Sequence, residues 1–249
     1  MRAMKVRLYV VNASHPCATV EAALQRKRIP YRLAELPPPM HMAFMRMRFG
    51  RRTVPAISID GEKLSGSRAI MRRLDELVPE PAMYPPDPAE RARVEAAEAW
   101  GDEVLQGYAR RVVWPTFRAH PEAMHSFQKG SKLPALPVPV LKVMAPVATR
   151  IEMRANEATS ATYPEDLRAL PEILDTADGF IADGVIGGEQ PNAADLQIAP
   201  SLCLLMGLGD LRPLIEERPC GRLARRLFPD FPGDAPQGMI PAELMPATA

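Results

Sequence analysis

The stretch TVPAISIDGEKLSGSRAI, residues 53–70, carries the pattern of two short strands followed by a helix start. Ala56–Ile59 is a short apolar run, and Asp60-Gly61 is a strong hairpin-turn signal. Residues 62–64 then predict the returning strand. Ser67 is a favourable N-cap for a helix whose apolar side chains recur at helical spacing. The stretch therefore predicts a β-hairpin that leads directly into a helix.

A strand, a helix and a second strand are predicted before this hairpin. Residues 6–11 form a β-branched apolar run of buried-strand length. Ser14 and Pro16 predict a helix start, because serine caps a helix well and proline suits its first turn. Residues 30–36 alternate like another strand. This order of elements is that of a thioredoxin-like α/β domain, which we expect at residues 1–80.

A proline-rich segment at residues 81–88 predicts a linker, and helical patterns follow it. We therefore expect an all-helical domain at residues 89–249. Its predicted helices are residues 89–114, residues 165–178 and residues 192–206, of which the last is apolar and is expected to be the buried central helix.

Two parts of this second domain are expected to be irregular. Residues 129–146 contain the segment KLPALPVPVLKVMAP, whose prolines argue against one regular helix. We expect a loop or short helices there, as a proline-rich insertion. The tail from Phe228 onward is rich in proline and glycine, and we expect it to be extended.

The composition excludes several classes of function. The 249 residues carry 31 basic and 30 acidic side chains, so the net charge of +1 gives no support for a nucleic-acid groove. No apolar stretch approaches the roughly 20 residues that span a bilayer, so we expect no membrane partner and a cytoplasmic location. Cys17, Cys203 and Cys220 lack metal-ligand spacing, so we expect neither a disulfide framework nor a metal site.

The segment SHPC, residues 14–17, has the form of a redox Cys-x-x-Cys motif with serine in the first position. The amino end of a helix favours an anion, because exposed amides and the helix dipole point toward it. Three interpretations follow from these residues: a hydroxyl-based active site at Ser14, a plain N-cap, or a thiol-disulfide reductase that acts through Cys17. Without a cysteine at position 14, Cys17 cannot form the local disulfide of a redox pair, which favours a packing role.

Taken in order, the motifs SHPC, TVPAISIDGEKLSGSRAI and PNAADLQIAPSL resemble those of the glutathione S-transferase family. SHPC is similar to the Ser-x-Pro-Cys motif of theta-class enzymes. The resemblance covers most of the chain. It implies an α/β thioredoxin-like N-terminal domain plus an all-α C-terminal domain, a homodimer, and conjugation of a thiol to a small electrophile, as in detoxification.

The resemblance also implies roles for individual residues. Ser14 would donate a hydrogen bond to the sulfur of glutathione and favour the thiolate, which is the nucleophilic form. Val54, before a cis Pro55, would pair its backbone with the cysteinyl part of the ligand. Ser67 and the amides of its helix would hold the γ-glutamyl carboxylate. Arg52 and Arg68 are nearby cations suited to a ligand carboxylate. The predicted thiol-binding residues are therefore Arg52, Thr53, Val54, Pro55, Ser67 and Arg68.

Gly66 departs from the family's pattern, in which Glu or Gln commonly precedes the serine of this helix start. We therefore expect the co-substrate to be glutathione or another low-molecular-weight thiol, with no metal. A protein of another class is the alternative: a non-catalytic thioredoxin-like binding or regulatory protein that keeps the fold.

An acceptor pocket is expected between the two domains, on the first long helix of the second. Tyr108, Trp114 and Phe117 are its predicted lining residues. Asp195 follows an N-cap asparagine by three residues, which predicts a variant of the capping box at the central helix. We therefore assign Asp195 to folding and not to catalysis.

Overall fold

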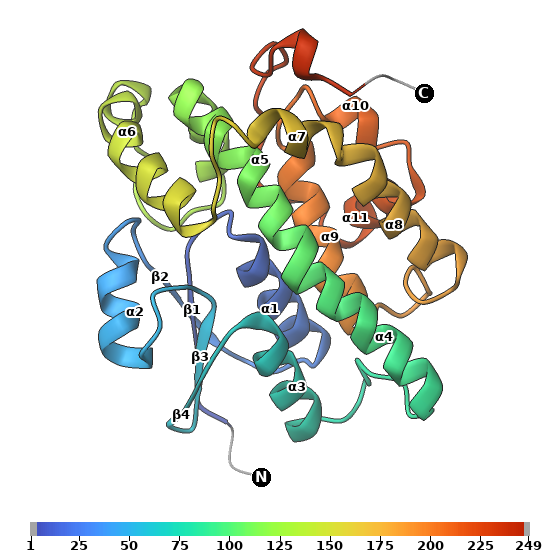
Figure 1. Ribbon diagram of the computed structural model, residues 1–249. Coiled ribbons are helices and arrows are strands. Elements are labelled where there is room, and N and C mark those ends of the chain that lie inside the picture. Colours follow the sequence, from blue (N-terminus) through green and yellow to red (C-terminus); the bar gives the residue numbers. More distant parts are fainter. Residues whose placement is uncertain (1–3, 247–249) are drawn as a thin grey trace.

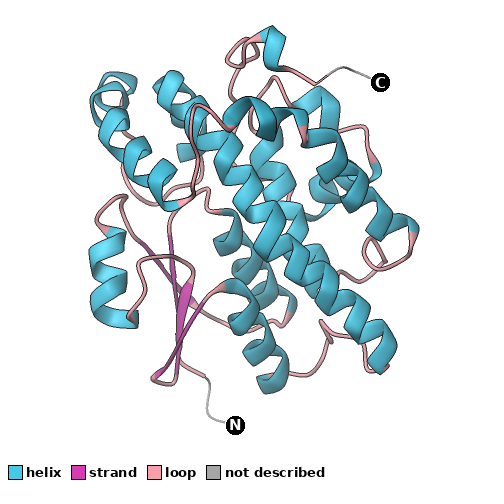
Figure 2. Cartoon of the chain, viewed as in Figure 1, coloured by secondary structure: helices cyan, strands magenta, loops and turns pink. Residues whose placement is uncertain are grey.

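A computed structural model of the chain describes residues 4–246 and shows a small sheet at one end of a mostly helical molecule (Figure 1). The four strands lie between α2 on one side and α1 with α3 on the other, and the remaining helices stack beyond them (Figures 1 and 2). The elements in chain order are β1 (Val6–Val10), α1 (His15–Arg26), β2 (Arg32–Glu35), α2 (His41–Phe49), β3 (Ala56–Ile59), β4 (Glu62–Ser65), α3 (Ser67–Leu77), α4 (Pro88–Trp100), the π-helical turn η1 (Gly101–Leu105), α5 (Gln106–Ala119), the 3-10 helix η2 (Pro121–Gln128), α6 (Val138–Ala155), α7 (Tyr163–Arg168), α8 (Leu170–Ala182), α9 (Ala193–Met206), α10 (Arg212–Ile215), α11 (Pro219–Leu227) and the 3-10 turn η3 (Ala242–Leu244).

The sheet has the strand order β2-β1-β3-β4. β1 runs parallel to β2 and antiparallel to β3, and β3 runs antiparallel to β4. A helical crossover between β1 and β2 and a hairpin between β3 and β4 are the connections that parallel and antiparallel neighbours require. The thioredoxin-like α/β domain predicted from the sequence is confirmed.

The alternation of side chains along β1 explains why helices cover both faces of the sheet. Leu8 and Val10 belong to the main hydrophobic core, whereas Tyr9 points to the other face and packs with Met45 and Ala56. Successive side chains of a strand point to opposite faces, so a strand with buried apolar side chains on both faces needs a cover on each side. α2 supplies the second cover.

Two local features of this domain differ from the sequence-based prediction. The Met- and Arg-rich segment before the hairpin, for which no element was predicted, forms α2 (His41–Phe49). Ser67 was predicted to be the N-cap of α3, and this is wrong by one residue: Gly66 occupies the N-cap and Ser67 is the first helical residue. The strand β3 and its turn are confirmed.

The prediction of a loop or short helices at residues 129–146 is wrong for its second half, where α6 runs over Val138–Ala155. Pro139 lies in the first turn, where an amide hydrogen has no helical partner in any case. Only Pro146 therefore removes a hydrogen bond from the interior of the helix. Residues 129–137 are non-helical, as predicted.

The helix predicted at residues 165–178 is two helices, α7 and α8. Pro171 stands in the first turn of α8, which suits a new helix start. α8 continues through Gly179, where its end was predicted, and stops at Ala182. Gly184 follows in a left-handed conformation with a φ of 68°, which commonly terminates a helix.

α9 is the buried central helix predicted from the sequence, since all of its residues are buried. The predicted capping box is present. The Asn192 side chain accepts hydrogen bonds from the backbone amides of Ala194 and Asp195, and the Asp195 carboxylate accepts one from the Asn192 amide at 2.8 Å. Asp195 also accepts from the Gly187 amide at 2.8 Å, so its role in folding is clear.

The main hydrophobic core is continuous from the sheet through α1 and α3 into α9 and α11. The predicted long helix of the second part, residues 89–114, is confirmed as α4, η1 and α5 in unbroken succession. The tail beyond α11 consists mostly of turns, bends and unassigned residues, with the 3-10 turn η3 near the end of its described part. The division into residues 1–80, 81–88 and 89–249 stays a prediction.

Candidate active site

The segments of the candidate site meet at one end of the sheet because of the strand register. Tyr9, near the end of β1, pairs with Ala56 at the start of β3, and Ala56 pairs with Ser65 at the end of β4. The Gly66 amide donates to the Pro55 carbonyl at 3.1 Å. The start of α1, the segment before β3 and the start of α3 therefore lie at the same edge.

Ser14 occupies the N-cap position of α1 without capping it. Its backbone carbonyl accepts from the amides of Cys17 and Ala18 at 2.9 and 3.0 Å, and its own amide donates to Val11. Its hydroxyl, however, caps no amide of α1 in the described part of the chain. A plain N-cap serine would place its side-chain oxygen on one of these amides. The half-buried Ser14 hydroxyl is therefore not used for capping.

Cys17 is a packing residue of the core, with 4% of its surface exposed. Burial raises the pKa of its thiol to about 12, although the Ser14 side chain and the Val11 backbone oppose part of that rise. Since the thiolate is the reactive form in disulfide exchange, a thiol with this pKa is inert at neutral pH. The structure therefore argues against a reductase that acts through Cys17.

The peptide bond between Val54 and Pro55 is cis, as the resemblance implied. Val54 is half-buried, and its backbone N–H and C=O have no hydrogen-bond partner within residues 4–246. Arg52 and Thr53 precede it and are exposed. The backbone at Val54 is thus available to an extended peptide, which can pair with it as an added strand.

Ser67 lies at the first position of α3, 3% exposed, and its hydroxyl has no hydrogen-bond partner in the described residues. Gly66 before it has a φ of 93° and a ψ of 135°. Residues other than glycine rarely adopt a positive φ. The local backbone therefore explains the glycine that stands where the family commonly has Glu or Gln.

Arg68 does not face the thiol site as an unpaired cation. Its guanidinium pairs with Glu103 at 2.8 Å and approaches Glu98 at 3.6 Å. Glu98 is fully buried and also accepts a hydrogen bond from the Tyr84 hydroxyl at 2.7 Å. Arg68 therefore holds α3 against α4 and η1.

The start of α1 is fixed on α9 by buried polar contacts. His15 Nδ1 and Ser201 Oγ lie 2.8 Å apart, and the Thr19 hydroxyl donates to the Leu196 carbonyl at 2.9 Å. Burial lowers the pKa of His15 well below its ordinary range, and the charge of Arg110 lowers it further. Its Nε2 has no partner among the described residues. His15 is therefore a neutral residue that positions Ser14.

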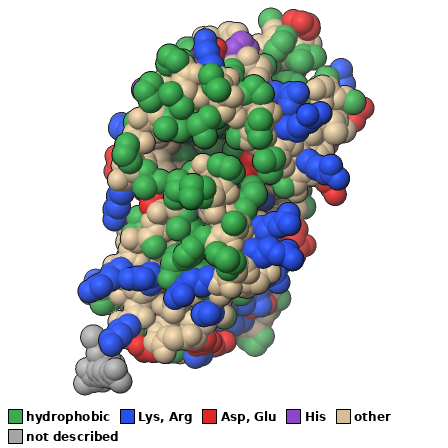
Figure 3. Space-filling view, turned by 90° about the vertical axis from the view of Figure 1, so that its left-hand side faces the viewer, with side chains coloured by type: hydrophobic (Ala, Val, Ile, Leu, Met, Phe, Trp, Pro, Cys, Tyr) green, Lys and Arg blue, Asp and Glu red, His purple; other side chains and the backbone are tan. Residues whose placement is uncertain are grey.

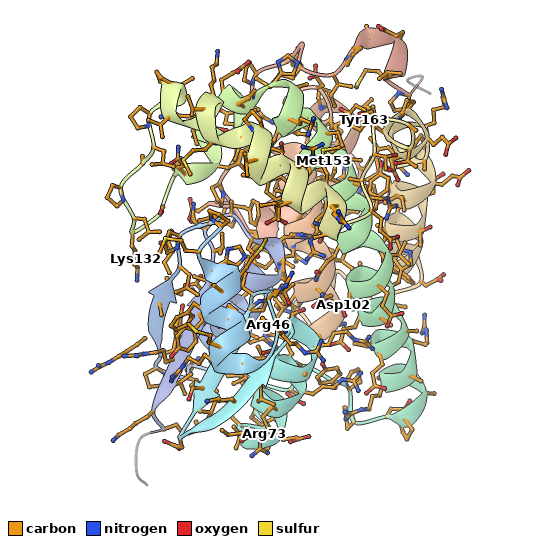
Figure 4. The ribbon with its side chains drawn as sticks, turned by 60° about the vertical axis from the view of Figure 1, so that its left-hand side comes forward. Arg46, Arg73, Asp102, Lys132, Met153 and Tyr163 are labelled. Carbon is orange, nitrogen blue, oxygen red and sulfur yellow. The ribbon has the colours of Figure 1, made fainter. Side chains whose placement is uncertain are left out.

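A polar stripe on η1 and α5 was missed by the sequence analysis. Arg110 donates to Gln106 at 2.9 Å, and Asp102 accepts from Gln197 at 3.2 Å. The charge of Arg110 lowers the pKa values of both His15 and Cys17, so this cation lies within electrostatic reach of the α1 start. The spacing of four residues between Asp102, Gln106 and Arg110 was the available signal, since such residues share a helix face. In Figure 4, Asp102 projects from this run, below α6 with its labelled Met153.

The three residues predicted to line an acceptor pocket lie mostly in the core. Tyr108 is 1% exposed, and its hydroxyl donates to the Asp166 carbonyl at 2.9 Å. Phe117 is buried and packs edge-on against Phe127, with ring centroids 5.0 Å apart. Trp114 is half-buried. Of the three, Trp114 therefore has the most surface to offer a ligand.

Two hollows of the described surface lie elsewhere. One of about 410 Å³ is bordered by Arg26, Pro81 and Gln190, and one of about 360 Å³ by His125 and Phe231. Neither is lined by the motif residues. The candidate site is therefore defined by the convergence of the motif residues and by the unpartnered Val54 backbone and Ser67 hydroxyl.

Comparisons with known proteins agree with this arrangement. Residues 8–82 match the model of the glutathione S-transferase N-terminal domain. No curated protein matches the chain. A beta-etherase from Sphingobium superposes with a TM-score of 0.61 at 16% identity, over 89% of this chain and 99% of that chain. A glutathione transferase from Populus trichocarpa gives 0.61 at 15% identity, over 90% and 93%.

A maleylacetoacetate isomerase from Anaeromyxobacter dehalogenans was solved with glutathione bound in its active site. It superposes with a TM-score of 0.56 at 22% identity, over 95% of this chain and 100% of that chain. At such identities the likeness to solved structures concerns the fold, and the family model concerns the first domain. The chain therefore has the fold of the glutathione transferases, and its residues 8–82 match the model of their N-terminal domain.

Proposed function

We propose that the protein is a glutathione transferase-like enzyme that holds glutathione, or another small thiol, as a thiolate for attack on a small electrophile. One observation carries the proposal. The Ser14 hydroxyl stands at the amino end of α1 and does not cap it within the described residues, at the same sheet edge as the unpartnered Val54 backbone. A hydroxyl at a helix start that does not cap the helix suits an anion.

Activation of the thiol is the step assigned to Ser14. An ordinary thiol has a pKa of about 8.5, so most of it is protonated and poorly nucleophilic at neutral pH. The Ser14 hydroxyl donates a hydrogen bond to the sulfur, and the dipole of α1 and the charge of Arg110 also favour the negative form. The thiol proton leaves to solvent. The thiolate then forms the sulfur–carbon bond, and the electrophile's leaving group departs with its electron pair.

Binding of the thiol is assigned to the segments before β3 and α3. The Val54 backbone, turned by cis Pro55, pairs with the ligand's peptide group, and Arg52 and Thr53 flank it at the surface. Ser67 and the first amides of α3 receive the carboxylate. Arg68 is better explained by its ion pairs with Glu98 and Glu103. The isomerase structure with bound glutathione supports this choice of thiol.

The electrophile is assigned to the region between the α1 start and the run of η1 and α5. Trp114 offers a partly exposed aromatic surface there, and Arg110 a cation. The homodimer, the cytoplasmic location and a role in detoxification remain parts of the proposal that follow from the resemblance. Light scattering of the purified chain tests the dimer.

The test combines binding with turnover. Glutathione and a panel of other small thiols are added to the protein in a thermal-shift experiment, because a ligand raises apparent stability by mass action. The thiols that bind are then assayed for conjugation to a chromogenic electrophile. Saturable conjugation supports the enzyme. Binding without conjugation to any electrophile of the panel favours the non-catalytic binding protein, and no binding at all contradicts both.

A further inference from the structure

Two segments of the chain are rich in basic and apolar residues and contain no acidic residue. Residues 36–59 carry Arg46, Arg48, Arg51 and Arg52, and residues 129–151 carry Lys129, Lys132, Lys142 and Arg150. The remainder of the chain holds all 30 acidic residues against 23 basic ones. The net charge of +1 therefore conceals a strongly uneven distribution.

The same two segments expose most of the large apolar side chains that reach solvent. Met40, the N-cap residue of α2, is 70% exposed, and Met47 on α2 is 82% exposed. On α6, the exposed fractions are 79% for Val143 and 66% for Val147, with Val140 and Ile151 near 40%. Scattered exposed apolar residues are ordinary on protein surfaces, but a cluster of them marks an interaction site.

The exposed apolar residues of α6 form one face of the helix. Val140, Val143, Val147 and Ile151 follow one another at intervals of three and four, which places them on one side. Leu141, Ala145, Thr149 and Met153 are buried on the opposite side. α6 therefore packs inward by one face and presents the other, equally apolar, to solvent.

α2 and α6 border the same side of the molecule (Figure 1). Seen from that side, hydrophobic side chains gather over much of the surface, with Lys and Arg side chains around them (Figure 3). We call the surface formed by Met40, Met47, Val140, Val143, Val147 and Ile151 with the eight basic residues above the basic-apolar face.

This face is held in place by the loop before α6. The Glu35 carboxylate, at the end of β2, accepts hydrogen bonds from the Ser131 hydroxyl and from the Lys132 amide. The Asn12 side chain donates to the Phe127 carbonyl at 2.8 Å. These contacts join the segment before α6 to the sheet, so the two parts of the face keep a fixed relation.

From this combination we propose that the basic-apolar face docks peripherally on a membrane surface of anionic lipid. Apolar side chains inserted at the lipid boundary, flanked by cations that meet anionic headgroups, are the two attractions that hold such a surface. No helix within residues 4–246 is both long and apolar enough to cross a membrane. The proposal is of surface attachment, and it departs from the expectation of no membrane partner.

A second copy of the chain is a poorer occupant of this face. In a two-fold contact the same patch meets itself, so the basic residues of one copy would oppose those of the other, and the two segments supply no acidic residue to neutralise them. Nucleic acid would satisfy the cations but leave the apolar residues without a partner. An anionic bilayer satisfies both.

The test is co-sedimentation of the full chain with vesicles. One set contains phosphatidylcholine alone, and the other an equal mixture of phosphatidylcholine and phosphatidylglycerol. We expect sedimentation with the anionic set only, and release by added salt. Lys132→Gln with Arg150→Gln should weaken binding roughly 10- to 30-fold, since each cation near an anionic surface contributes about five-fold.

The apolar part is tested with Val143→Glu and Val147→Glu together, two solvent-exposed changes that leave the packed face of α6 intact. We expect this variant to lose vesicle binding and to keep its thermal transition. Val104→Glu is the matched control, because Val104 is 42% exposed on η1, outside both segments, and should bind as the wild type does.

Three results would overturn the proposal. They are equal binding to both vesicle sets, no binding to either, and a dimer in light scattering that the Val143→Glu, Val147→Glu variant converts to monomer. The last would assign the face to a second copy. The vesicle assay needs no thiol and no electrophile, so its outcome is separate from that of the conjugation assay.

Discussion

His15 Nδ1 lies 2.8 Å from Ser201 Oγ, a buried contact between the residue that follows Ser14 and the central helix α9. His15, the neighbour of the residue that we propose binds the thiol, is thereby fixed to a helix far along the chain. Because the imidazole is 4% exposed and its pKa is lowered well below the ordinary value of 6.5, it stays neutral in the folded protein.

The pH dependence of stability should reflect this buried imidazole. In the unfolded chain His15 takes up a proton below its ordinary pKa of 6.5, whereas the folded state resists it because burial lowers the pKa. Stability is then fully present above pH 6.5 and falls as the pH drops, with a slope that approaches about 1.4 kcal/mol per pH unit. Urea denaturation at several pH values measures the slope. In His15→Gln it should become shallower, and an unchanged slope would count against this assignment.

Ser14→Ala should separate catalysis from folding. The hydroxyl caps no amide of α1 in the described residues, so the free energy of unfolding should change by less than about 0.5 kcal/mol. Conjugation should fall by about 100-fold or more, as when one donor to a reacting anion is removed. Ser14→Thr keeps a hydroxyl and should recover part of the rate. A loss of stability without a loss of rate would favour the interpretation of Ser14 as a plain N-cap.

Ser67→Ala should weaken thiol binding at no cost in stability. The Ser67 hydroxyl is buried without a partner in the described residues, so its removal leaves no donor stranded, and the melting temperature should stay level or rise slightly. If the hydroxyl binds the ligand carboxylate, KM for the thiol should increase by roughly ten-fold, the value of one charged hydrogen bond. Titration with the thiol checks this, and an unchanged KM would remove Ser67 from the site.

Substitution by valine should destabilise the protein at one glycine of the long helical run and have little effect at another. A Cβ at Gly101 would come within 3.0 Å of Ile198 and 3.1 Å of Gln197, on α9, so Gly101→Val should destabilise by about 2 kcal/mol. A Cβ at Gly107 meets only the end of the Arg111 side chain at 3.5 Å. Gly107→Val should therefore be close to neutral. Equal losses in denaturant unfolding would show that η1 can shift away from α9.

The parts of the fold that the sequence predicted are those governed by local signals. The turn at Asp60-Gly61 and the capping box at Asn192 depend on residues within a few positions, and both are confirmed. α6 was not predicted because its segment is rich in proline, although Pro139 falls in the first turn, where a helix tolerates it. α2 was not predicted because its stabilising contacts are made with Tyr9, which lies far earlier in the sequence.

The candidate site was predictable only in part, for a related reason. Ser14 and Val54 stand in motifs whose order along the chain identified them. Arg110 and Asp102 stand in no motif, and the electrostatic effect of Arg110 on His15 and Cys17 arises only in the folded chain. Tyr108 shows the opposite error, since an aromatic residue at helical spacing looks the same in a sequence whether it faces a pocket or the core.

The packing of α1 on α9 has a consequence for how the two parts of the chain can evolve. The family model recognises residues 8–82, yet the His15 and Thr19 side chains form hydrogen bonds to α9, and the hydrophobic core runs without interruption across that boundary. A gene fusion or cloning border placed after residue 82 would leave these buried groups facing water. The first segment could not be exchanged between relatives as a free module, and substitutions in α1 and α9 should be selected together.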